Sequence, residues 1–183
     1  MPTAVETARY LIHLASRERE PVWLTHLQLE KLLYYVQAWT LVARRKPFFD
    51  DRIEAWKYGP VVPSVYQILK PFEKNPIPHT EGEDGSRLNQ EERSIIRSVW
   101  EGYKAYSPLG LAIKTHDERP WAETFRPDSD GRCSNEIPLE LMRTFFEGKY
   151  RQHQRPGFEL ETLRRAEEEL QLGRVVPFES AFS

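Results

Sequence analysis

One stretch of 40 residues decides the fold, and residues 24–63 read LTHLQLEKLLYYVQAWTLVARRKPFFDDRIEAWKYGPVVP. Thr25 and Gln28 have the N-cap and N3 spacing of a capping box, in which each side chain satisfies the other residue's free backbone N–H. The spacing of the apolar residues that follow is helical. The stretch therefore predicts one long helix over about 25–45.

The predicted helix is apolar on most of its circumference. Two neighbouring stripes of mostly apolar residues run along it, and the opposite side carries apolar residues as well. The clearest line of polar residues has only three members. The stripes are Leu29, Leu33, Val36, Thr40 and Ala43, and Leu32, Tyr35, Trp39 and Val42; the opposite side has Leu27, Tyr34 and Leu41; the polar line is Glu30, Gln37 and Arg44. A helix of this kind is usually contacted on several sides. We therefore expect it to be the centre of a mainly α-helical domain.

A small β element is expected after this helix. Ile53 and Ala55 alternate with more polar neighbours over 52–58, which is the period of a strand. A single strand is unstable alone, so it needs a partner. The candidates are the segment around 48–49 and the segment near 87–88, and the sequence does not decide between them. Gly59-Pro60 is expected to be a turn.

Shorter helices fill most of the remaining chain. They are predicted over 3–17, from Pro63 to before Pro71, from Asn89 to about Tyr106, from Ser107 to near His116, over 119–125, and from Pro138 to Glu147. Gly148 is expected to end the last of these. We expect one domain over 1–148, followed by a charged helix and tail over 149–183.

Composition limits the class of protein. The chain has 183 residues, of which 39% are hydrophobic and 30% charged, with a net charge of −2 and one cysteine. These values fit a globular, cytoplasmic protein with no disulfide. No secretory leader and no membrane-spanning run is expected. The near-neutral charge makes a general nucleic-acid binder unexpected.

The sequence offers little catalytic chemistry. It lacks a Gly-x-Ser-x-Gly elbow, a Gly-rich phosphate loop and a zinc motif, so no catalytic residue, metal or cofactor is predicted. The best cluster is 115–118, where His116 precedes two acidic residues. Adjacent residues of a helix do not face each other, so this cluster is poor evidence for a catalytic pair. The preferred interpretation is that His116 lies in the last turn of a helix and interacts with the negative end of the helix dipole.

Large aromatic residues suggest a binding surface instead. Trp56, Tyr58 and Trp121 are of the type that anchors protein interfaces, although for Trp56 alone a place in the core is the preferred interpretation. A helical line that includes Lys31 and Tyr34 is either exposed and available for binding or a solvated face.

Three segments carry a resemblance to a known family. They are Leu29 to Trp39, Lys46 to Asp50 and Ile53 to Tyr66, with a weaker stretch from Leu111 to Trp121. Together they closely resemble the Panacea domain of SocA-like antitoxins, over about residues 4–147. The resemblance implies a mainly α-helical fold with a small β element. It also implies a bacterial or prophage cytosolic protein that binds and neutralises a toxin encoded by an adjacent gene, in some members by delivery to a protease.

The expected toxin-binding surface follows from the motif and the aromatic residues. It comprises Lys31, Tyr34, Trp56, Tyr58 and Pro60, with Trp121 beside them. Two alternatives remain: an enzyme that uses His116 with a nearby carboxylate, and a regulatory module associated with DNA.

Overall fold

A computed structural model describes residues 1–79, 85 and 87–153. In this part of the chain the elements are α1 (Ala4–Ser16), α2 (His26–Arg44), β1 (Glu54–Trp56), β2 (Gly59–Val61), α3 (Pro63–Leu69), the 3-10 turn η1 (Lys70–Phe72), α4 (Gln90–Tyr103), α5 (Pro108–His116), α6 (Arg119–Thr124) and α7 (Leu139–His153). The prediction of a mainly α-helical fold with a small β element is confirmed, although this element lies at 54–61.

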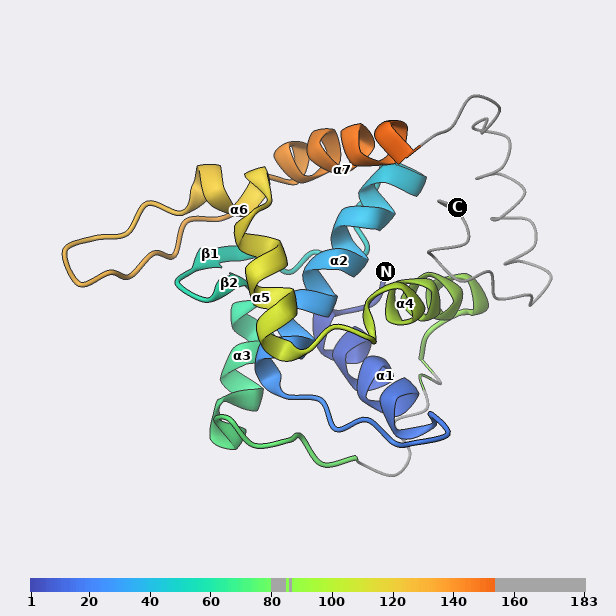
Figure 1. Cartoon of the computed structure of the whole chain (residues 1–183). Coiled ribbons are helices and arrows are strands. Elements are labelled where there is room, and N and C mark those ends of the chain that lie inside the picture. The colour runs from blue at the N-terminus through green and yellow to red at the C-terminus, as the bar shows by residue number, and fades with distance from the viewer. Residues whose placement is uncertain (80–84, 86, 154–183) are drawn as a thin grey trace.

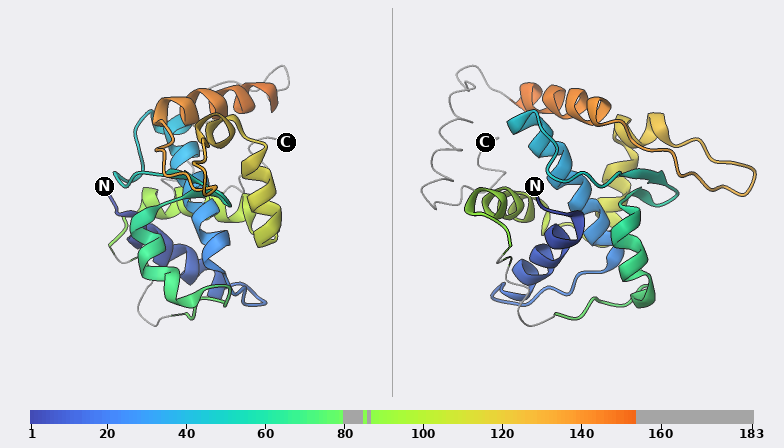
Figure 2. Two further views of the ribbon diagram at one scale, coloured as in Figure 1. Left: turned by 90° about the vertical axis from the view of Figure 1, so that its left-hand side faces the viewer. Right: turned by 180° about the vertical axis from the view of Figure 1, so that it is seen from behind.

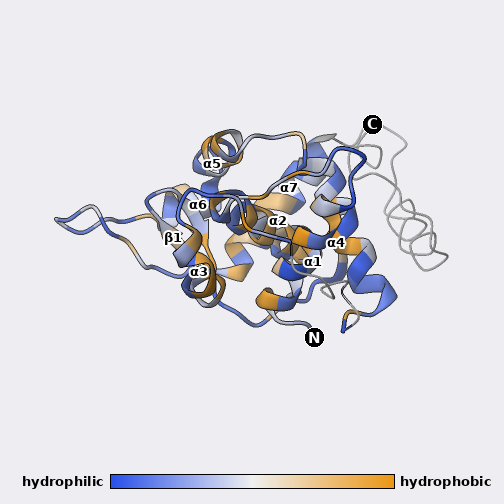
Figure 3. Ribbon diagram, turned by 90° about the horizontal axis from the view of Figure 1, so that it is seen from below, coloured by the Kyte–Doolittle hydropathy of each residue, from blue (hydrophilic) through white to orange (hydrophobic). Residues whose placement is uncertain are grey.

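Helix α2 is the centre of the molecule, as predicted. It packs against α1, α3, α4, α5, α7 and β2, and the ribbon shows it running through the middle of these elements (Figures 1 and 2). Its apolar residues lie at the centre when the molecule is viewed from below (Figure 3). Leu29, Leu33 and Tyr35 have no exposed surface. Burial of such side chains is the main driving force for this architecture.

The start of α2 follows the predicted capping box only in part. Thr25 is the N-cap, and its hydroxyl accepts a hydrogen bond from the Gln28 N–H at 3.4 Å. The Gln28 side chain donates to the backbone carbonyl of Tyr106 at 3.0 Å instead of turning back to Thr25. Gln28 therefore joins α2 to the segment between α4 and α5.

Aromatic stacking joins the C-terminal half of α2 to α4 and α7. Tyr35 stacks on Tyr103 with ring centroids 3.9 Å apart, and the Trp39 indole donates to the Tyr103 hydroxyl at 2.8 Å. Phe146 of α7 meets Trp39 edge-to-face at 4.9 Å. These contacts link residues more than 60 positions apart in sequence, so they form only when the chain is folded.

The strand partner of β1 is β2, and both predicted partners were wrong. The two strands form an antiparallel hairpin in which Trp56 pairs with Gly59 across the turn at 57–58. Gly59 has a φ of +99°, the left-handed conformation that commonly follows such a turn and that favours glycine. Pro60 lies opposite Ala55 in β2. A proline at this position lacks the N–H of a usual strand residue, so the sequence pattern indicated a turn alone.

The segment proposed as a partner of β1 has another role. The Gln37 side-chain oxygen accepts hydrogen bonds from the Phe48 N–H at 2.7 Å and the Phe49 N–H at 3.3 Å, and its amide donates to the Phe49 carbonyl at 3.0 Å. One buried side chain of α2 thus takes up the backbone groups of this loop. The free edge of β1 meets 135–137, through the Ala55 N–H and the Asn135 carbonyl at 2.9 Å.

Helix α7 does not end at Gly148 as predicted but continues to His153. The extra turn is anchored, because Lys149 forms an ion pair with Glu118 and Tyr150 is 5% exposed. The other residues of the predicted appendage, 154–183, lie outside the described residues. The division into 1–148 and 149–183 therefore stays a prediction.

Candidate binding groove

A groove of about 1160 Å³ opens beside the hairpin. Its lining comes from the start of α2, the hairpin, α3, the segment after η1, the first residue of α5 and the projecting loop at 128–134. Figure 1 shows the hairpin, α3 and this loop on the same side of the molecule. Six separate segments therefore meet at one surface.

Aromatic rings form one wall of the groove. Trp56 packs edge-to-face on Tyr66 at 4.7 Å, and His26 meets the same Tyr66 ring at 5.9 Å. Tyr58 lies at the rim with 64% of its surface exposed. A large exposed aromatic beside half-buried rings is typical of a protein-binding surface.

Two charged residues of α2 are buried beneath the groove. The Lys31 ammonium donates to the Pro60 carbonyl at 2.8 Å, and Glu30 Oε2 accepts from the Val62 N–H at 2.7 Å. These bonds take up backbone groups of β2 and of the residue that follows it. Glu30 Oε1 is buried and has no hydrogen-bond partner within the described residues. Burial raises the pKa of the Glu30 carboxyl and lowers the pKa of the Lys31 ammonium.

Gly59 is required by packing as well as by its conformation. A Cβ atom at this position would lie 2.6 Å from Lys31 Cε and 2.7 Å from Thr115 Oγ1. Both neighbours are fully buried, so neither can move away easily. The hairpin can therefore approach α2 and α5 this closely only with glycine here.

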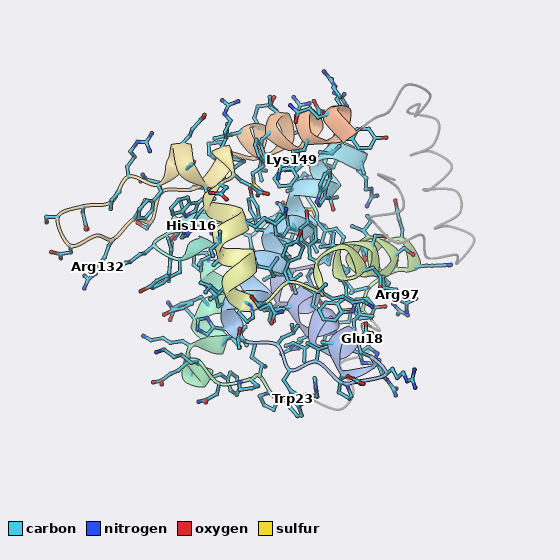
Figure 4. The ribbon with its side chains drawn as sticks, in the orientation of Figure 1. Glu18, Trp23, Arg97, His116, Arg132 and Lys149 are labelled. Carbon is cyan, nitrogen blue, oxygen red and sulfur yellow. The ribbon has the colours of Figure 1, made fainter. Side chains whose placement is uncertain are left out.

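Trp121 supports the hairpin from the other side. Its indole donates to the Trp56 carbonyl at 2.8 Å, and its ring stacks on His116 at 4.0 Å. His116 lies beside the hairpin at the end of α5 (Figure 4). Burial, followed by the charge of Lys31, lowers the pKa of His116, and its Nε2 atom is buried without a partner among the described residues.

A second buried carboxyl lies at the start of α6. Glu118 Oε1 accepts from the Lys149 ammonium at 2.7 Å and from the Tyr35 hydroxyl at 3.4 Å. Burial raises the pKa of Glu118, while Lys149 acts in the opposite direction. Glu118 thus joins α6 to α2 and α7, and it is not part of the groove lining.

The structure brings together some of the predicted surface residues and not others. Lys31, Trp56 and Tyr58 line the groove, whereas Pro60 is buried and contributes its carbonyl. The alternative of an exposed line through Lys31 and Tyr34 is wrong, because neither side chain has any exposed surface. Tyr34 lies in the core, where it contacts Phe146.

Several groove residues were missed by sequence reasoning. They are Glu30, His26, Tyr66 and the loop at 128–134. The loop carries a polar Asp-Ser-Asp-Gly signature that indicates only a turn. Glu30 and Tyr66 lie in the segments that resemble the Panacea domain, and this was the one sequence feature that could have pointed to these two residues. Nothing local in the sequence places the loop beside α2.

The described residues hold no group of three His, Cys, Asp or Glu side chains that could bind a metal ion. Of the helices in residues 1–79 and 87–153, none has the length and apolar character needed to cross a membrane.

Together, these observations describe a mainly helical protein with an aromatic-walled groove beside its β-hairpin. Residues 29–122, just over half of the chain, match the family described as "Antitoxin SocA-like, Panacea domain", and the chain belongs to this family. It is similar to Antitoxin SocA of Caulobacter vibrioides, with 43% identity over 46 residues. This match covers 25% of the chain and 24% of that protein, so it spans about a quarter of the curated relative. No solved structure matches.

Proposed function

We propose that this protein is a bacterial or prophage antitoxin that neutralises a cognate toxin by direct protein–protein contact at the groove. The observation that carries the proposal is membership of the SocA-like antitoxin family, together with a groove that the matched segment lines in part and that is rimmed by the exposed Tyr58. The toxin is expected to be encoded beside this protein and to be met in the cytoplasm. Delivery of the bound toxin to a protease is a further form of the same activity.

The apolar surface extends from the groove onto α5. Pro108 lines the groove, and Leu109 and Ile113 follow on the outer face of the same helix. These two side chains are 66% and 54% exposed, and residues four positions apart in a helix are neighbours. A standard interface covers about 800 Å² on each partner and takes most of its energy from a few such anchors. The groove and this helix face together suit that role.

The geometry of His116 favours binding over catalysis. Its ring is stacked on Trp121, and burial lowers its pKa and disfavours its charged form. The acidic residue after it, Asp117, influences it only through charge. A general base needs a partner that orients its ring, and His116 Nε2 has no hydrogen-bond partner among the described residues.

Co-expression tests the proposed function. The open reading frame beside this gene is expressed alone and together with the protein, and growth is measured. Growth arrest by the neighbour that the protein relieves, with co-purification of the two, is the expected result. A harmless neighbour, or arrest without relief, would contradict the antitoxin proposal.

Matched variants then locate the interface. Leu109→Ala removes an exposed anchor next to the groove, and we expect about tenfold weaker toxin binding. Ile68→Ala is the control, because Ile68 is 52% exposed but does not line the groove. Equal binding by both variants would place the toxin on another surface.

A further inference from the structure

Helix α5 turns one side toward the core and the other toward solvent. Leu111, Ala112 and Thr115 are its buried residues. The opposite side, with the residue that precedes the N-cap, is called the α5 face here and comprises Tyr106, Leu109, Gly110, Ile113 and Lys114. Its three large apolar side chains are all exposed. Several such side chains gathered on one surface mark an interaction site, whereas single ones do not.

The shape of the α5 face suits a second helix. Leu109 and Ile113 are one turn apart and form a ridge along α5. Gly110 has no side chain, and a Cβ atom added to it would lie 3.8 Å from the Tyr106 ring. The backbone of a partner helix can therefore come close beside the ridge, which is how ridges and grooves of two helices pack together.

The hairpin next to α5 does not suit an added strand. Pro60 of β2 has no N–H to donate, and its carbonyl already accepts the Lys31 ammonium at 2.8 Å. On the side of β1, the Ala55 N–H and the Ile53 carbonyl are both bonded to the segment at 135–137. Strand addition needs free backbone groups along an edge, so a partner at this surface is recognised through side chains.

The charge of the α5 face selects between possible helical partners. The Lys114 ammonium lies over the Tyr106 ring, 5.3 Å from its centre, and forms no ion pair with the described residues. Residues 102–116 contain two lysines and no acid, and Asp117 follows the last residue of α5. A second copy of this chain would bring the same cations to the contact, whereas an acidic helix edge complements them.

We propose that the α5 face binds an amphipathic α-helix of the toxin, whose aliphatic stripe packs on Leu109 and Ile113 and whose edge carries an acidic residue that meets Lys114. This inference rests on the proposed function and specifies the shape and chemistry of its partner. Aliphatic residues at helical spacing supply the contact area. The acidic residue fixes the orientation of the helix and disfavours basic helices.

Designed peptides test this chemistry without the toxin. The full-length protein, labelled with ¹³C at the isoleucine δ1-methyl groups, is titrated with a peptide of three copies of Leu-Ala-Glu-Leu-Leu-Ala-Glu. One matched peptide has Lys in place of every Glu, and another has a central Pro that breaks the helix. The Ile113 methyl reports the α5 face, and the methyl of Ile68, which is equally exposed on α3, is the internal control.

The Glu peptide is expected to shift the Ile113 methyl saturably and to leave the Ile68 methyl unchanged. It should bind at least about fivefold more tightly than the Lys peptide or the Pro peptide. Three results would overturn the proposal. They are equal binding of the Lys or the Pro peptide, equal shifts at Ile68 and Ile113, and no saturable shift up to roughly 1 mM.

Substitutions on the protein side test the two parts of the contact separately. Lys114→Gln should reduce the preference for the Glu peptide over the Lys peptide to below about twofold, while Lys57→Gln, the control outside α5, should keep it. Leu109→Ala should weaken binding of the Glu peptide by about fivefold. An unchanged preference in folded Lys114→Gln, or unchanged affinity in folded Leu109→Ala, would contradict the proposal.

The outcomes separate this inference from the proposed function. Relief of growth arrest in the co-expression experiment, combined with no preference for the helical Glu peptide, would leave the antitoxin function standing and reject the helix-binding face. A clear preference for that peptide in a protein that relieves no arrest would keep the helix-binding face and reject a toxin as its partner.

Discussion

Glu30 of α2 and Glu118, which precedes α6, are both buried, but their surroundings differ. Glu118 has an ion pair with Lys149 at 2.7 Å, and this pair joins helices α6 and α7. Glu30 bonds to the Val62 N–H of the hairpin segment, while its neighbour Lys31 bonds to the Pro60 carbonyl. The first acid is paired with a cation from another helix. The second takes up a backbone group. Each acid has one buried oxygen, Oε2 of Glu118 and Oε1 of Glu30, with no hydrogen-bond partner among the described residues.

The two acids differ in the kind of partner that each one has and in their position relative to the groove. A buried charge is tolerated when it is paired, and removal of its partner is strongly destabilising. The Glu118–Lys149 pair therefore holds α6 and α7 together, whereas Glu30 lines an open groove and holds the residue that follows β2.

The largest expected effect is on the Glu118 side. Lys149→Met keeps the contacts of the side chain with the Phe145 and Phe146 rings but removes the ammonium from Glu118. We expect the free energy of unfolding to fall by about 3 kcal/mol in a urea titration, because a buried carboxylate is left without a cation. Lys104→Met is the control: its partners Glu18 and Glu101 lie near the surface, so its loss should stay under about 1 kcal/mol. Equal losses of unfolding free energy in the two variants would show that the Glu118–Lys149 pair is worth no more than a surface ion pair.

The same variant should depend on pH. Burial raises the pKa of Glu118 above its ordinary value of 4.5, and loss of Lys149 would raise it further. A raised carboxyl pKa contributes stability that is complete below the ordinary value and is lost as pH rises through the folded-state pKa. The stability deficit of Lys149→Met should therefore be smaller at pH 4.5 than at neutral pH. A deficit that does not change with pH would show that Glu118 is not its cause.

The next effect concerns how closely the hairpin approaches α2. Gly59→Ala combines a left-handed φ with a Cβ placed against Lys31 and Thr115, and we expect a loss of about 2 kcal/mol. Gly131→Ala is a matched control, since Gly131 has a φ of +73° but nothing within 4 Å of the added Cβ, and it should lose about 1 kcal/mol. Thermal unfolding measures both. A loss for Gly59→Ala no larger than the control's would mean that the hairpin is free to shift.

A smaller effect distinguishes the Glu30 side by its pH dependence. The raised pKa of Glu30 means that wild type loses stability as pH rises from the ordinary value of 4.5, over a range that ends below the lowered pKa of Lys31, about 7. Glu30→Gln has no such titration, so its stability relative to wild type should increase over that range. Parallel stability curves from urea titrations at several pH values would contradict the buried-acid interpretation.

The smallest effect on stability is expected at the rim. Tyr58→Ala changes a side chain that is 64% exposed, so the free energy of unfolding should stay within about 0.5 kcal/mol of wild type. Binding to the toxin found by co-expression should nevertheless weaken by about tenfold. Tyr58→Phe, which keeps the ring, is the control and should bind almost as wild type. A large fall in melting temperature for Tyr58→Ala would make Tyr58 structural.

Features that depend on neighbouring residues were predictable from sequence. Helix α2 begins after Thr25 and α4 begins after Asn89 with a complete capping box, because caps are set by side chains within a few positions. The helix predicted over 3–17 is present as α1, and its apolar residues Ala4, Ala8, Leu11, Ile12 and Ala15, which recur at helical spacing, are buried.

Features that depend on distant residues were not predictable. Lysine is almost never fully buried, and Lys31 is buried here because the Pro60 carbonyl, 29 positions away, accepts its hydrogen bond. Tyr34 is buried because α7 covers it. The groove combines residues from 25 to 134, so only Trp56, Tyr58 and Lys31 of its lining had been named from the sequence, and their role in toxin binding stays a prediction.

The contacts between α2 and α7 also bear on how the chain folds during synthesis. Phe146 covers Tyr35 and Trp39 from more than 100 positions later in the sequence. The earlier helices can surround the other sides of α2 while the ribosome is still translating, but this aromatic face stays open to water until α7 has emerged. Closure of the core therefore waits for α7, and such an exposed face is a natural contact for a chaperone on the nascent chain.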